Sequence, residues 1–248
     1  MPDKRKHRGR HPRDEQLFAP GWHDALRSAV DDSAWLLSRR YAESATLKLV
    51  GDRHKLTSRQ RMAVRRSTCS DESLRRRRAA TLPMDQIGAR PLGIDGYNLL
   101  ITIESALAGG LILLGRDGCC RDLAGIHGTY RKVSETAPAF QRIVDELCRF
   151  NVSRVDWYLD RPVSNSGRLK MFMADILAAG NARPEPQTVW NIELVESPDA
   201  VLIDYAGVVA TSDSVILDRC RAWVNLAREM IDARIPNAWV VDLSRSAR

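Results

Sequence analysis

Residues 91–115 read PLGIDGYNLLITIESALAGGLILLG, and this stretch decides how the second half of the chain folds. It opens with a short apolar run, LGID, and continues into a segment, Tyr97–Ala108, whose composition favours a helix. A second apolar run, GLILLG at 110–115, follows at once. The order strand, helix, strand is typical of proteins that cover a sheet with helices.

The same alternation continues to the end of the chain. The apolar runs show no period-two pattern, which favours a parallel sheet buried on both faces. We therefore predict an α/β fold for residues 89–248, namely a three-layer α/β/α domain with a mainly parallel sheet. The further strands are expected at 154–159, 189–195, 207–211 and 238–243, and the further helices at 137–150, 168–179, from Pro198 and at 215–233.

The positive charge of the chain is concentrated in its first 90 residues, which hold 21 Lys and Arg against 11 Asp and Glu. Residues 91–248 hold 17 against 20, so a basic part precedes a mildly acidic one. Dense positive charge attracts polyanions through counterion release, and nucleic acid is the commonest such partner. A solvated helix face is the alternative interpretation. The candidate nucleic-acid-binding residues are Arg65, Arg66, Arg75, Arg76, Arg77 and Arg78.

The basic part is predicted to be helical throughout. Residues 1–20 are expected to be a flexible basic arm, and residues 21–88 a small all-helical basic domain. Apolar residues recur at helical spacing over 22–40. A second helix is expected to begin at Thr57, because its hydroxyl and the side chain of Gln60 can satisfy each other's backbone amides. An arginine-rich third segment follows.

Several classes of protein are excluded by the sequence. The longest apolar stretch, Ala106–Leu114, is about half of what a membrane-spanning helix needs. The basic start lacks the apolar segment of a secretory signal, so we expect a cytoplasmic protein. The five cysteines include no Cys-x-x-Cys pair, which argues against a disulfide framework or a zinc site. P-loop, G-x-G-x-x-G and G-x-S-x-G motifs are absent, and Tyr97 stands where a haloacid-dehalogenase-type phosphatase needs an aspartate.

Carboxylates follow four of the predicted strands. Parallel strands deliver their carboxyl ends to one edge of the sheet, where sites are found. Like charges gathered there need a counter-charge, and Mg²⁺ or Mn²⁺ suits oxygen ligands. Each residue also has an ordinary explanation as a turn former before glycine or proline, or as a helix cap. The four candidate catalytic residues are Asp95, Asp160, Asp199 and Asp213, of which Asp95, Asp199 and Asp213 are the candidate metal ligands.

Other polar residues are candidates for supporting roles. Asn98 either orients Asp95 or caps a helix, and Glu104 either leans toward the site from the first helix or is solvated. The connection at 121–131 adds Asp122 and His127. A turn of Ser and Asn residues after the strand at 154–159 either presents amides and hydroxyls to a phosphate or is an ordinary polar loop. The residues of that turn are Ser164, Asn165 and Ser166.

The segments GIDGYNLL (93–100) and SPDAVLIDYAGVVATSDSVIL (197–217) resemble the start and end of PIN-like nuclease domains, in particular the NYN branch. The resemblance implies that Asp95, Asp199 and Asp213 are metal-binding carboxylates, and that Asn98 and Ser212 support them. It implies less for Asp160, because the middle acid varies among branches.

The whole chain also resembles an uncharacterised bacterial and archaeal family, known as domain of unknown function 434, together with a companion C-terminal domain. The stretches that carry this resemblance are LVGDRHKLTSRQRMAVRRSTCSD (49–71), RDLAGIHGTYR (121–131) and LDRPVSNSGRL (159–169). This second resemblance implies relatives but no activity.

The leading functional hypothesis from the sequence is a nuclease dependent on Mg²⁺ or Mn²⁺ that acts on nucleic acid, RNA before DNA. Two alternatives remain open. The first is a nucleic-acid-binding protein with a PIN-like fold that does not cut. The second is a small-molecule phosphoesterase that uses the same carboxylates, which would leave the arginine run without a role.

Overall fold

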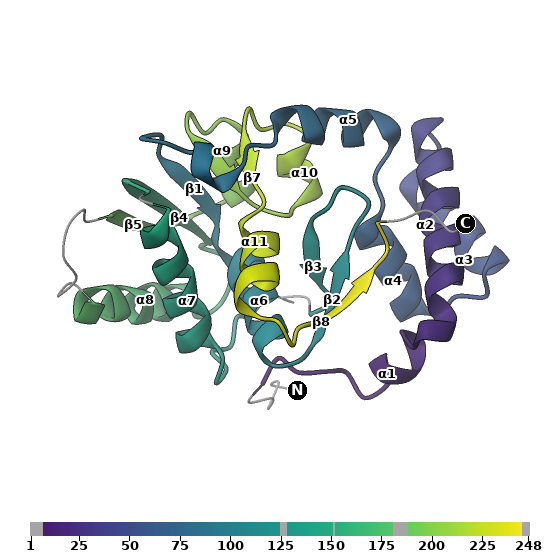
Figure 1. The fold of residues 1–248 in the computed structure, drawn as a ribbon, viewed down its shortest axis with the longest axis horizontal. Coiled ribbons are helices and arrows are strands. Elements are labelled where there is room, and N and C mark those ends of the chain that lie inside the picture. Colours follow the sequence, from purple (N-terminus) through teal and green to yellow (C-terminus); the bar gives the residue numbers. More distant parts are fainter. Residues whose placement is uncertain (1–6, 125–127, 151, 181–187, 245–248) are drawn as a thin grey trace.

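The computed structural model describes residues 7–124, 128–150, 152–180 and 188–244. At its centre lies a five-stranded sheet in which all strands are parallel, in the order β5-β4-β1-β6-β7 (Figure 1). The sheet consists of β1 (Leu92–Asp95), β4 (Arg154–Asp160), β5 (Val189–Val195), β6 (Val208–Ala210) and β7 (Trp223–Val224). The predicted α/β class and the mostly parallel sheet are therefore confirmed.

The order of the strands creates a switch point beside β1. From β1 the chain builds outward through β4 to β5, and it then returns to the other side of β1 to add β6 and β7. The register aligns Leu92 with both Val155 and Val208. Sites in open parallel sheets are commonly found at the carboxyl ends of the strands beside such a switch point, which here are the ends of β1 and β6.

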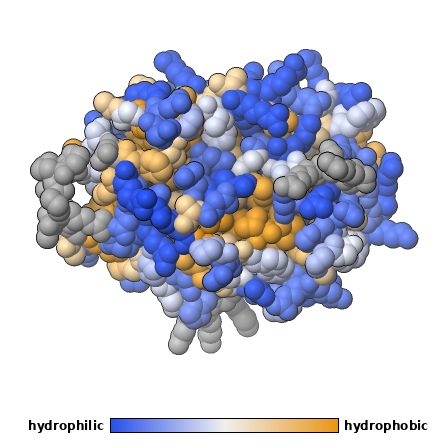
Figure 2. All heavy atoms as spheres, viewed as in Figure 1, coloured by the Kyte–Doolittle hydropathy of each residue, from blue (hydrophilic) through white to orange (hydrophobic). Residues whose placement is uncertain are grey.

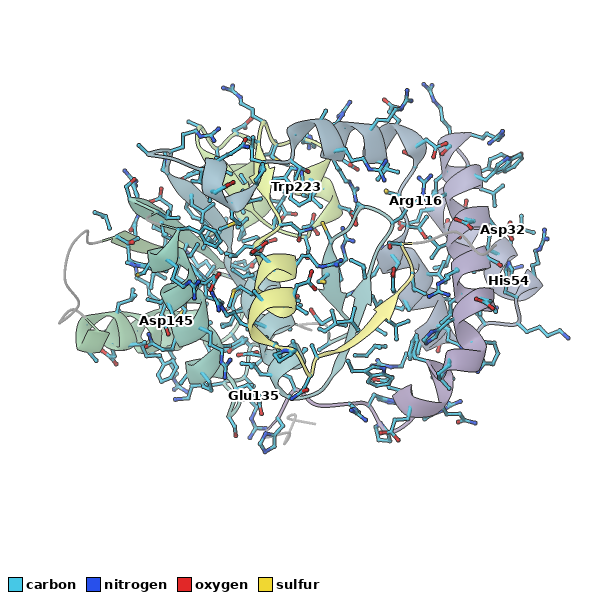
Figure 3. The ribbon with its side chains drawn as sticks, viewed as in Figure 1. Asp32, His54, Arg116, Glu135, Asp145 and Trp223 are labelled. Atoms are coloured by element: carbon cyan, nitrogen blue, oxygen red, sulfur yellow. The ribbon has the colours of Figure 1, made fainter. Side chains whose placement is uncertain are left out.

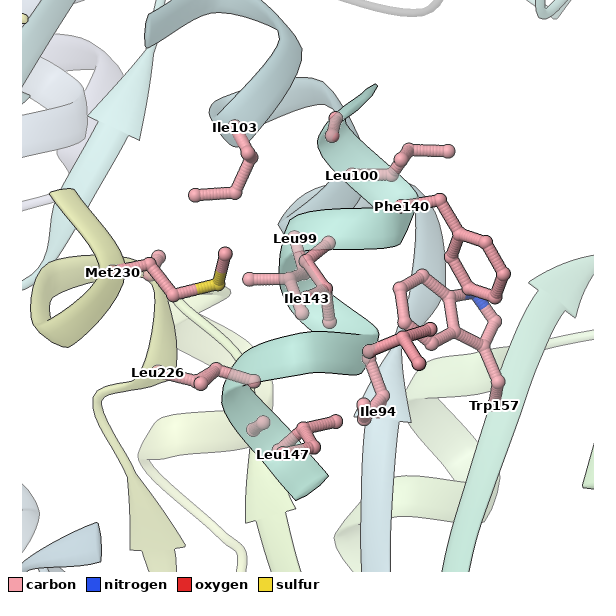
Figure 4. Close-up of a cluster of buried hydrophobic side chains, with 14 of the residues drawn as sticks. Ile94, Leu99, Leu100, Ile103, Phe140, Ile143, Leu147, Trp157, Leu226 and Met230 are labelled. Carbon is pink, nitrogen blue, oxygen red and sulfur yellow. The ribbon is translucent and has the colours of Figure 1, made fainter. Parts of the chain in front are cut away.

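Helices cover both faces of this sheet. On one face, Ile94 and Trp157 pack under α6, α7 and α11, with Phe140 edge-on to Trp157 at 5.3 Å between ring centroids (Figure 4). On the other face, Val209 and Trp223 pack against side chains of α9 and α10. These helices are α6 (Gly96–Leu107), α7 (Thr136–Arg149), α8 (Ser166–Gly180), α9 (Pro198–Ile203), α10 (Ser214–Leu217) and α11 (Leu226–Arg234).

A second, three-stranded sheet was not expected. It has the order β3-β2-β8, with β3 antiparallel and β8 parallel to β2, and it lies between the main sheet and the N-terminal helices (Figure 1). Ile112 of β2 packs toward the main core, whereas Leu111 and Leu113 pack toward those helices. A strand buried on both faces shows no period-two pattern, so its sequence could not reveal that it leaves the main sheet. The strands are β2 (Leu111–Leu114), β3 (Cys120–Asp122) and β8 (Trp239–Asp242).

The N-terminal part is helical, as predicted. The capping box at the start of α4 is present, with Thr57 and Gln60 each accepting a bond from the other's backbone. Leu26 and Val64 share one buried cluster with Leu113 of β2, so these helices are packed against the second sheet. The helices are α1 (Asp14–Leu17, not predicted), α2 (His23–Ser38), α3 (Glu43–Arg53, not predicted), α4 (Ser58–Ser67) and α5 (Asp71–Ala80), with 3₁₀ turns at Pro20–Trp22 and Met84–Gln86. The helix α1 lies in the segment expected to be a flexible arm, where Leu17 and Phe18 are instead buried in the same cluster. No helix in the described residues is both long and apolar enough to span a bilayer.

The long helix predicted at 215–233 is wrong. The segment forms α10, then β7, then α11. Trp223 decides the difference: it pairs with Val209 on β6, its carbonyl accepts the amide of Leu82, and its indole donates to the carbonyl of Arg77 at 2.8 Å. Tertiary pairing at the sheet edge therefore overrides the local helical pattern.

A core variant tests how firmly the helices and the second sheet are joined. Leu113 is fully buried between them, so Leu113→Ala should lower the free energy of unfolding by about 2–5 kcal/mol. Leu49→Ala, at a position that is 59% exposed, should change it by no more than about 0.5 kcal/mol. Urea denaturation measures both, and equal losses would contradict the shared core.

Candidate active site

Asp95 lies at the tip of β1, at the switch point of the main sheet. The helix α6 begins at the very next residue, Gly96. A Cβ atom at this position would lie 2.2 Å from the indole nitrogen of Trp157 and 2.4 Å from the carbonyl oxygen of Tyr158. Only glycine lets α6 start this close to β4. The Asp–Gly pair that alone indicates a turn is therefore a direct junction between strand and helix.

The carboxylate of Asp95 is buried among other acids. The residue is 7% exposed, and its Oδ2 accepts a hydrogen bond from the hydroxyl of Thr211 at 2.8 Å. Burial raises the pKa of Asp95 to about 7; the bond from Thr211 opposes this, and the charges of Asp213, Asp199 and Asp160 add to it. All three other predicted acids thus act on Asp95, as expected from their places at the strand ends.

Asp213 is both a helix cap and a neighbour of Asp95. Its Oδ1 accepts the amides of Val215 at 2.7 Å and Ile216 at 3.3 Å, which caps α10. Its own amide donates to the hydroxyl oxygen of Thr211 at 2.9 Å. Thr211 therefore links Asp213 to Asp95. Thr211 was not predicted as a site residue, although the stretch Thr-Ser-Asp was the visible signal.

Asp160 and Asp199 lie further toward solvent. Asp160 ends β4 and is half-buried, while Asp199 is exposed in the first turn of α9. Ser197 caps α9 by accepting the amide of Ala200 at 3.3 Å. Asp199 is therefore not the cap of this helix and lies in its first turn. Burial and the charges of Asp213 and Asp160 raise the pKa of Asp199. The pKa of Asp199 is therefore set in part by the same acids that act on Asp95.

Two polar residues at the start of α6 border the acids. The Oδ1 of Asn98 accepts both the amide of Ser212, at 3.1 Å, and its hydroxyl, at 2.6 Å. Asn98 thus fixes Ser212 and the end of β6. The hydroxyl of Tyr97 is buried and has no hydrogen-bond partner among the described residues, and burial and the charge of Asp160 raise its pKa. Tyr97 was not predicted as a site residue.

Glu104 and Asp122 do not reach the acids, contrary to the role considered for them. Glu104 lies eight residues into α6, roughly 12 Å along the helix from its start. It is not solvated either, because it is fully buried, accepts bonds from Tyr130 (2.5 Å) and Thr136 (2.6 Å), and pairs with Arg8. Asp122 is likewise buried and accepts a bond from the hydroxyl of a threonine in α6 at 3.1 Å.

The turn after β4 uses its polar groups within the chain. The backbone of Ser164 pairs with that of Gly128 and Tyr130, and Nδ2 of Asn165 donates to the carbonyl of Tyr130 at 3.0 Å. The hydroxyl of Ser166 donates to a backbone carbonyl at 3.4 Å. The turn therefore fits the description of an ordinary polar loop. His127, in the connection at 121–131, lies outside the described residues.

The arginines of α5 divide into exposed and buried members. Arg75, Arg76 and Arg78 are exposed. The helix α5 that carries them lies at the top of the view in Figure 1, and the surface there is largely hydrophilic in Figure 2. Arg77 is 2% exposed and pairs with Asp117 at 2.5 Å, so the nucleic-acid contact predicted for it is wrong. A run of four arginines on a helix cannot place all four side chains on one face.

The two arginines predicted on α4 are both engaged. Arg65 is exposed and pairs with Glu43 of α3, with 2.9 Å between Nε and Oε1. Arg66 donates to the carbonyl oxygen of Asp122 at 2.6 Å. Their contribution to nucleic-acid binding remains a prediction.

The acids have the chemistry of a divalent-cation site, but they are not closed around one. Among the described residues, no three His, Cys, Asp or Glu side chains form a group that could hold a metal ion as they stand. None of the groups that most strongly shift the pKa of Asp95 is a cation. A buried carboxylate among three others is a donor set that suits Mg²⁺ or Mn²⁺.

Comparison with known proteins shows the family. The model described as Domain of unknown function (DUF5616) matches residues 84–229, which include all four aspartates. The chain belongs to this family. The model described as Protein of unknown function (DUF434) matches residues 25–79, which lie within α2 to α5. An uncharacterized protein of Methanocaldococcus jannaschii is 28% identical over 210 residues, which cover 84% of this chain and 97% of the relative. No solved structure matches the chain.

The raised pKa of Asp95 predicts a particular dependence of stability on pH. The carboxyl titrates near 3.8 in the unfolded chain and near 7 in the metal-free folded protein. Its stabilising contribution is therefore full below pH 3.8 and is lost as the pH rises through 7. The Asp95→Asn variant lacks this loss, so its free energy of unfolding relative to wild type should rise by up to about 4 kcal/mol from acid to alkaline pH.

Urea denaturation in a chelator, repeated across that pH range, measures this difference. Asp175→Asn, at an exposed position on α8, is the matched control and should track wild type at every pH. Parallel curves for Asp95→Asn and wild type would show that Asp95 titrates normally.

Proposed function

We propose that this protein is a metal-dependent nuclease that cleaves phosphodiester bonds in RNA, on a PIN-like domain. The observation that carries the proposal is the gathering of Asp95, Asp160, Asp199 and Asp213 at the switch point of a parallel sheet, with Asp95 desolvated among them. The resemblance of residues 93–100 and 197–217 to NYN-type nucleases supports RNA as the substrate.

In this proposal Asp95, Asp199 and Asp213 would hold one or two Mg²⁺ or Mn²⁺ ions, and Asp160 would assist. When bound, such an ion activates water for attack on the phosphate and offsets charge on the leaving oxygen. The chain's own contribution is orientation. Thr211 donates to one oxygen of Asp95 and accepts the amide of Asp213, so the two central carboxylates are held in one arrangement before substrate binds.

The exposed arginines of α5 lie close to this site. Nη1 of Arg76 donates to the carbonyl of Asp218 at 2.6 Å, and only the short helix α10 separates Asp218 from Asp213. With Arg75 and Arg78, Arg76 offers positive charge beside the acids. A strand of RNA that contacts α5 through its phosphates could thus present a neighbouring phosphate to the carboxylates. Phosphate contacts of this kind hold the substrate without reading its sequence.

The decisive experiment measures cleavage of labelled RNA and DNA in Mn²⁺, beside a chelated control. Asp95→Asn and Asp213→Asn should each lower the cleavage rate more than about 100-fold, because changes outside the ligand shell of a metal already cost 10- to 100-fold. RNA affinity should be kept or improved, since negative charge is removed. Asp175→Asn should cleave like wild type.

The outcomes separate the hypotheses. Metal-dependent cleavage that survives in Asp95→Asn would overturn the assignment of the site. RNA binding without cleavage by the wild type would favour the non-cutting alternative. If the wild type neither binds nor cleaves RNA or DNA, the result would favour a small phosphorylated substrate.

A salt titration tests the role of α5. Replacing Arg75, Arg76 and Arg78 together with alanine should weaken RNA binding and reduce the slope of log affinity against log salt by about 2, at roughly 0.7 for each phosphate that is no longer neutralised. A matched triple variant on α7 and α8, on the other side of the molecule (Figure 1), should leave the slope unchanged. It replaces Arg142, Arg149 and Arg168, which are also exposed. Equal slopes for the two variants would place the RNA elsewhere.

A further inference from the structure

Arg121 is a buried arginine of β3 that no step of the proposed reaction uses. It is 7% exposed. Its Nη1 and Nη2 each donate to one oxygen of Asp117, at 2.9 and 2.7 Å, a bidentate pairing that fixes the plane of the guanidinium. Its remaining nitrogen, Nε, donates to the backbone carbonyl of Ser212 at 2.8 Å. Arg121 therefore reaches from the second sheet to the end of β6.

Ser212 lies in the chain between Thr211, which bonds to Asp95, and Asp213, whose charge acts on Asp95. Its amide and hydroxyl donate to Asn98, and its carbonyl accepts from Arg121. All three polar groups of Ser212 are thus held, from α6 on one side and from β3 on the other. Thr211 and Asp213 flank it directly, so their orientation follows from how Ser212 is fixed.

Asp117, which orients Arg121, also binds the arginine helix. Arg77 of α5 donates to Asp117 at 2.5 Å, to the side chain of Asp218 at 2.7 Å and to the carbonyl of Ser214 at 3.3 Å. Burial alone would raise the pKa of Asp117, but Arg121 and Arg77 hold that pKa well below its usual range. The ionised carboxylate therefore anchors both arginines, and α10 is held at both of its ends.

We infer that Arg121 is a positioning residue for the candidate active site: by binding Ser212 it sets the places of Thr211 and Asp213 relative to Asp95. This inference rests on the proposed function. Arg121 touches neither the acids' carboxylates nor any position proposed for the substrate, so it acts through the backbone. A buried charge network is weak as a source of stability, but its hydrogen bonds are directional and fix a geometry.

Arg116 provides the matched control. It lies in the loop between β2 and β3 that carries Asp117, and it ties that loop to the start of α5 through the carbonyl of Cys69 at 3.0 Å and the carboxylate of Asp71 at 2.5 Å. Figure 3 shows Arg116 beneath one end of α5 and Trp223 beneath the other. These two bonds point away from Ser212, toward the start of α5. Lysine at either position keeps the charge and loses the fork of donors.

The first test does not depend on any activity. Backbone amide exchange with deuterium is followed by NMR in wild type, Arg121→Lys and Arg116→Lys, with the exchange at Ser212 and Asp213 compared. Arg121→Lys should accelerate exchange at both amides by roughly tenfold or more, as expected for losing a bond to a charged group. Arg116→Lys should leave these two amides unchanged. Unchanged exchange in Arg121→Lys would overturn the inference.

The second test uses RNA cleavage. Arg121→Lys should lower kcat about 10- to 100-fold with KM for RNA within about twofold of wild type, whereas Arg116→Lys should keep kcat. If both variants lose kcat in proportion to their loss of melting temperature, the role of Arg121 is purely structural and the inference is wrong. If wild type cleaves nothing, the nuclease proposal fails, and amide exchange alone then decides whether Arg121 positions Ser212 and Asp213 at the end of β6. Arg121→Gln replaces the lysine variant in both tests if that variant does not fold.

Discussion

The hydrogen bond from Thr211 to Asp95 joins the ends of β1 and β6, and the arrangement of the site depends on it. The register that pairs Ile94 with Ala210 brings the next residue of each strand face to face. Because side chains alternate along a strand, both residues turn toward the face covered by α9 and α10. A shift of one residue in either strand would send one of these side chains into the apolar core instead. The apolar packing of Ile94 thus fixes the place of Asp95.

This arrangement places negative charge where it is costly. Asp95 is desolvated, and its three acidic neighbours raise its pKa further. The buried arginines Arg121 and Arg77 do not offset the charge of Asp95, because both are paired with Asp117. Arg121 reaches the end of β6 only through the backbone carbonyl of Ser212. The fold therefore neutralises these structural charges among themselves and leaves Asp95 without a cation among the groups that most strongly shift its pKa. In the proposed function, the charge of Asp95 would then be balanced by an external cation.

The sequence predicts the fold and the acids well where local patterns are sufficient. Apolar runs locate four of the five strands of the main sheet, and the rule that parallel strands end at one edge places Asp95 beside Asp213. It fails where distant contacts decide. The pairing of Trp223 with β6 replaces a predicted helix, and the burial of Arg77 depends on Asp117, forty residues away. The role of Arg121 has no local signal at all, because it consists of one bond to a backbone carbonyl ninety-one residues later.

The two parts of the chain that differ in charge are one structure around the site. Helices α2 and α4 share a core with the second sheet, and β3 of that sheet carries Arg121 to the end of β6. Arg77 binds the helix α5 to Asp117 and to Asp218, at the end of α10, while the exposed arginines of α5 face solvent. In the proposed function, an RNA strand bound by α5 would therefore lie at a fixed distance from Asp213, because no flexible linker separates α5 from the acids. A fixed spacing of this kind would bring one particular phosphate of the strand to the acids. Holding the reacting groups in one geometry is what orientation contributes to the rate of cleavage.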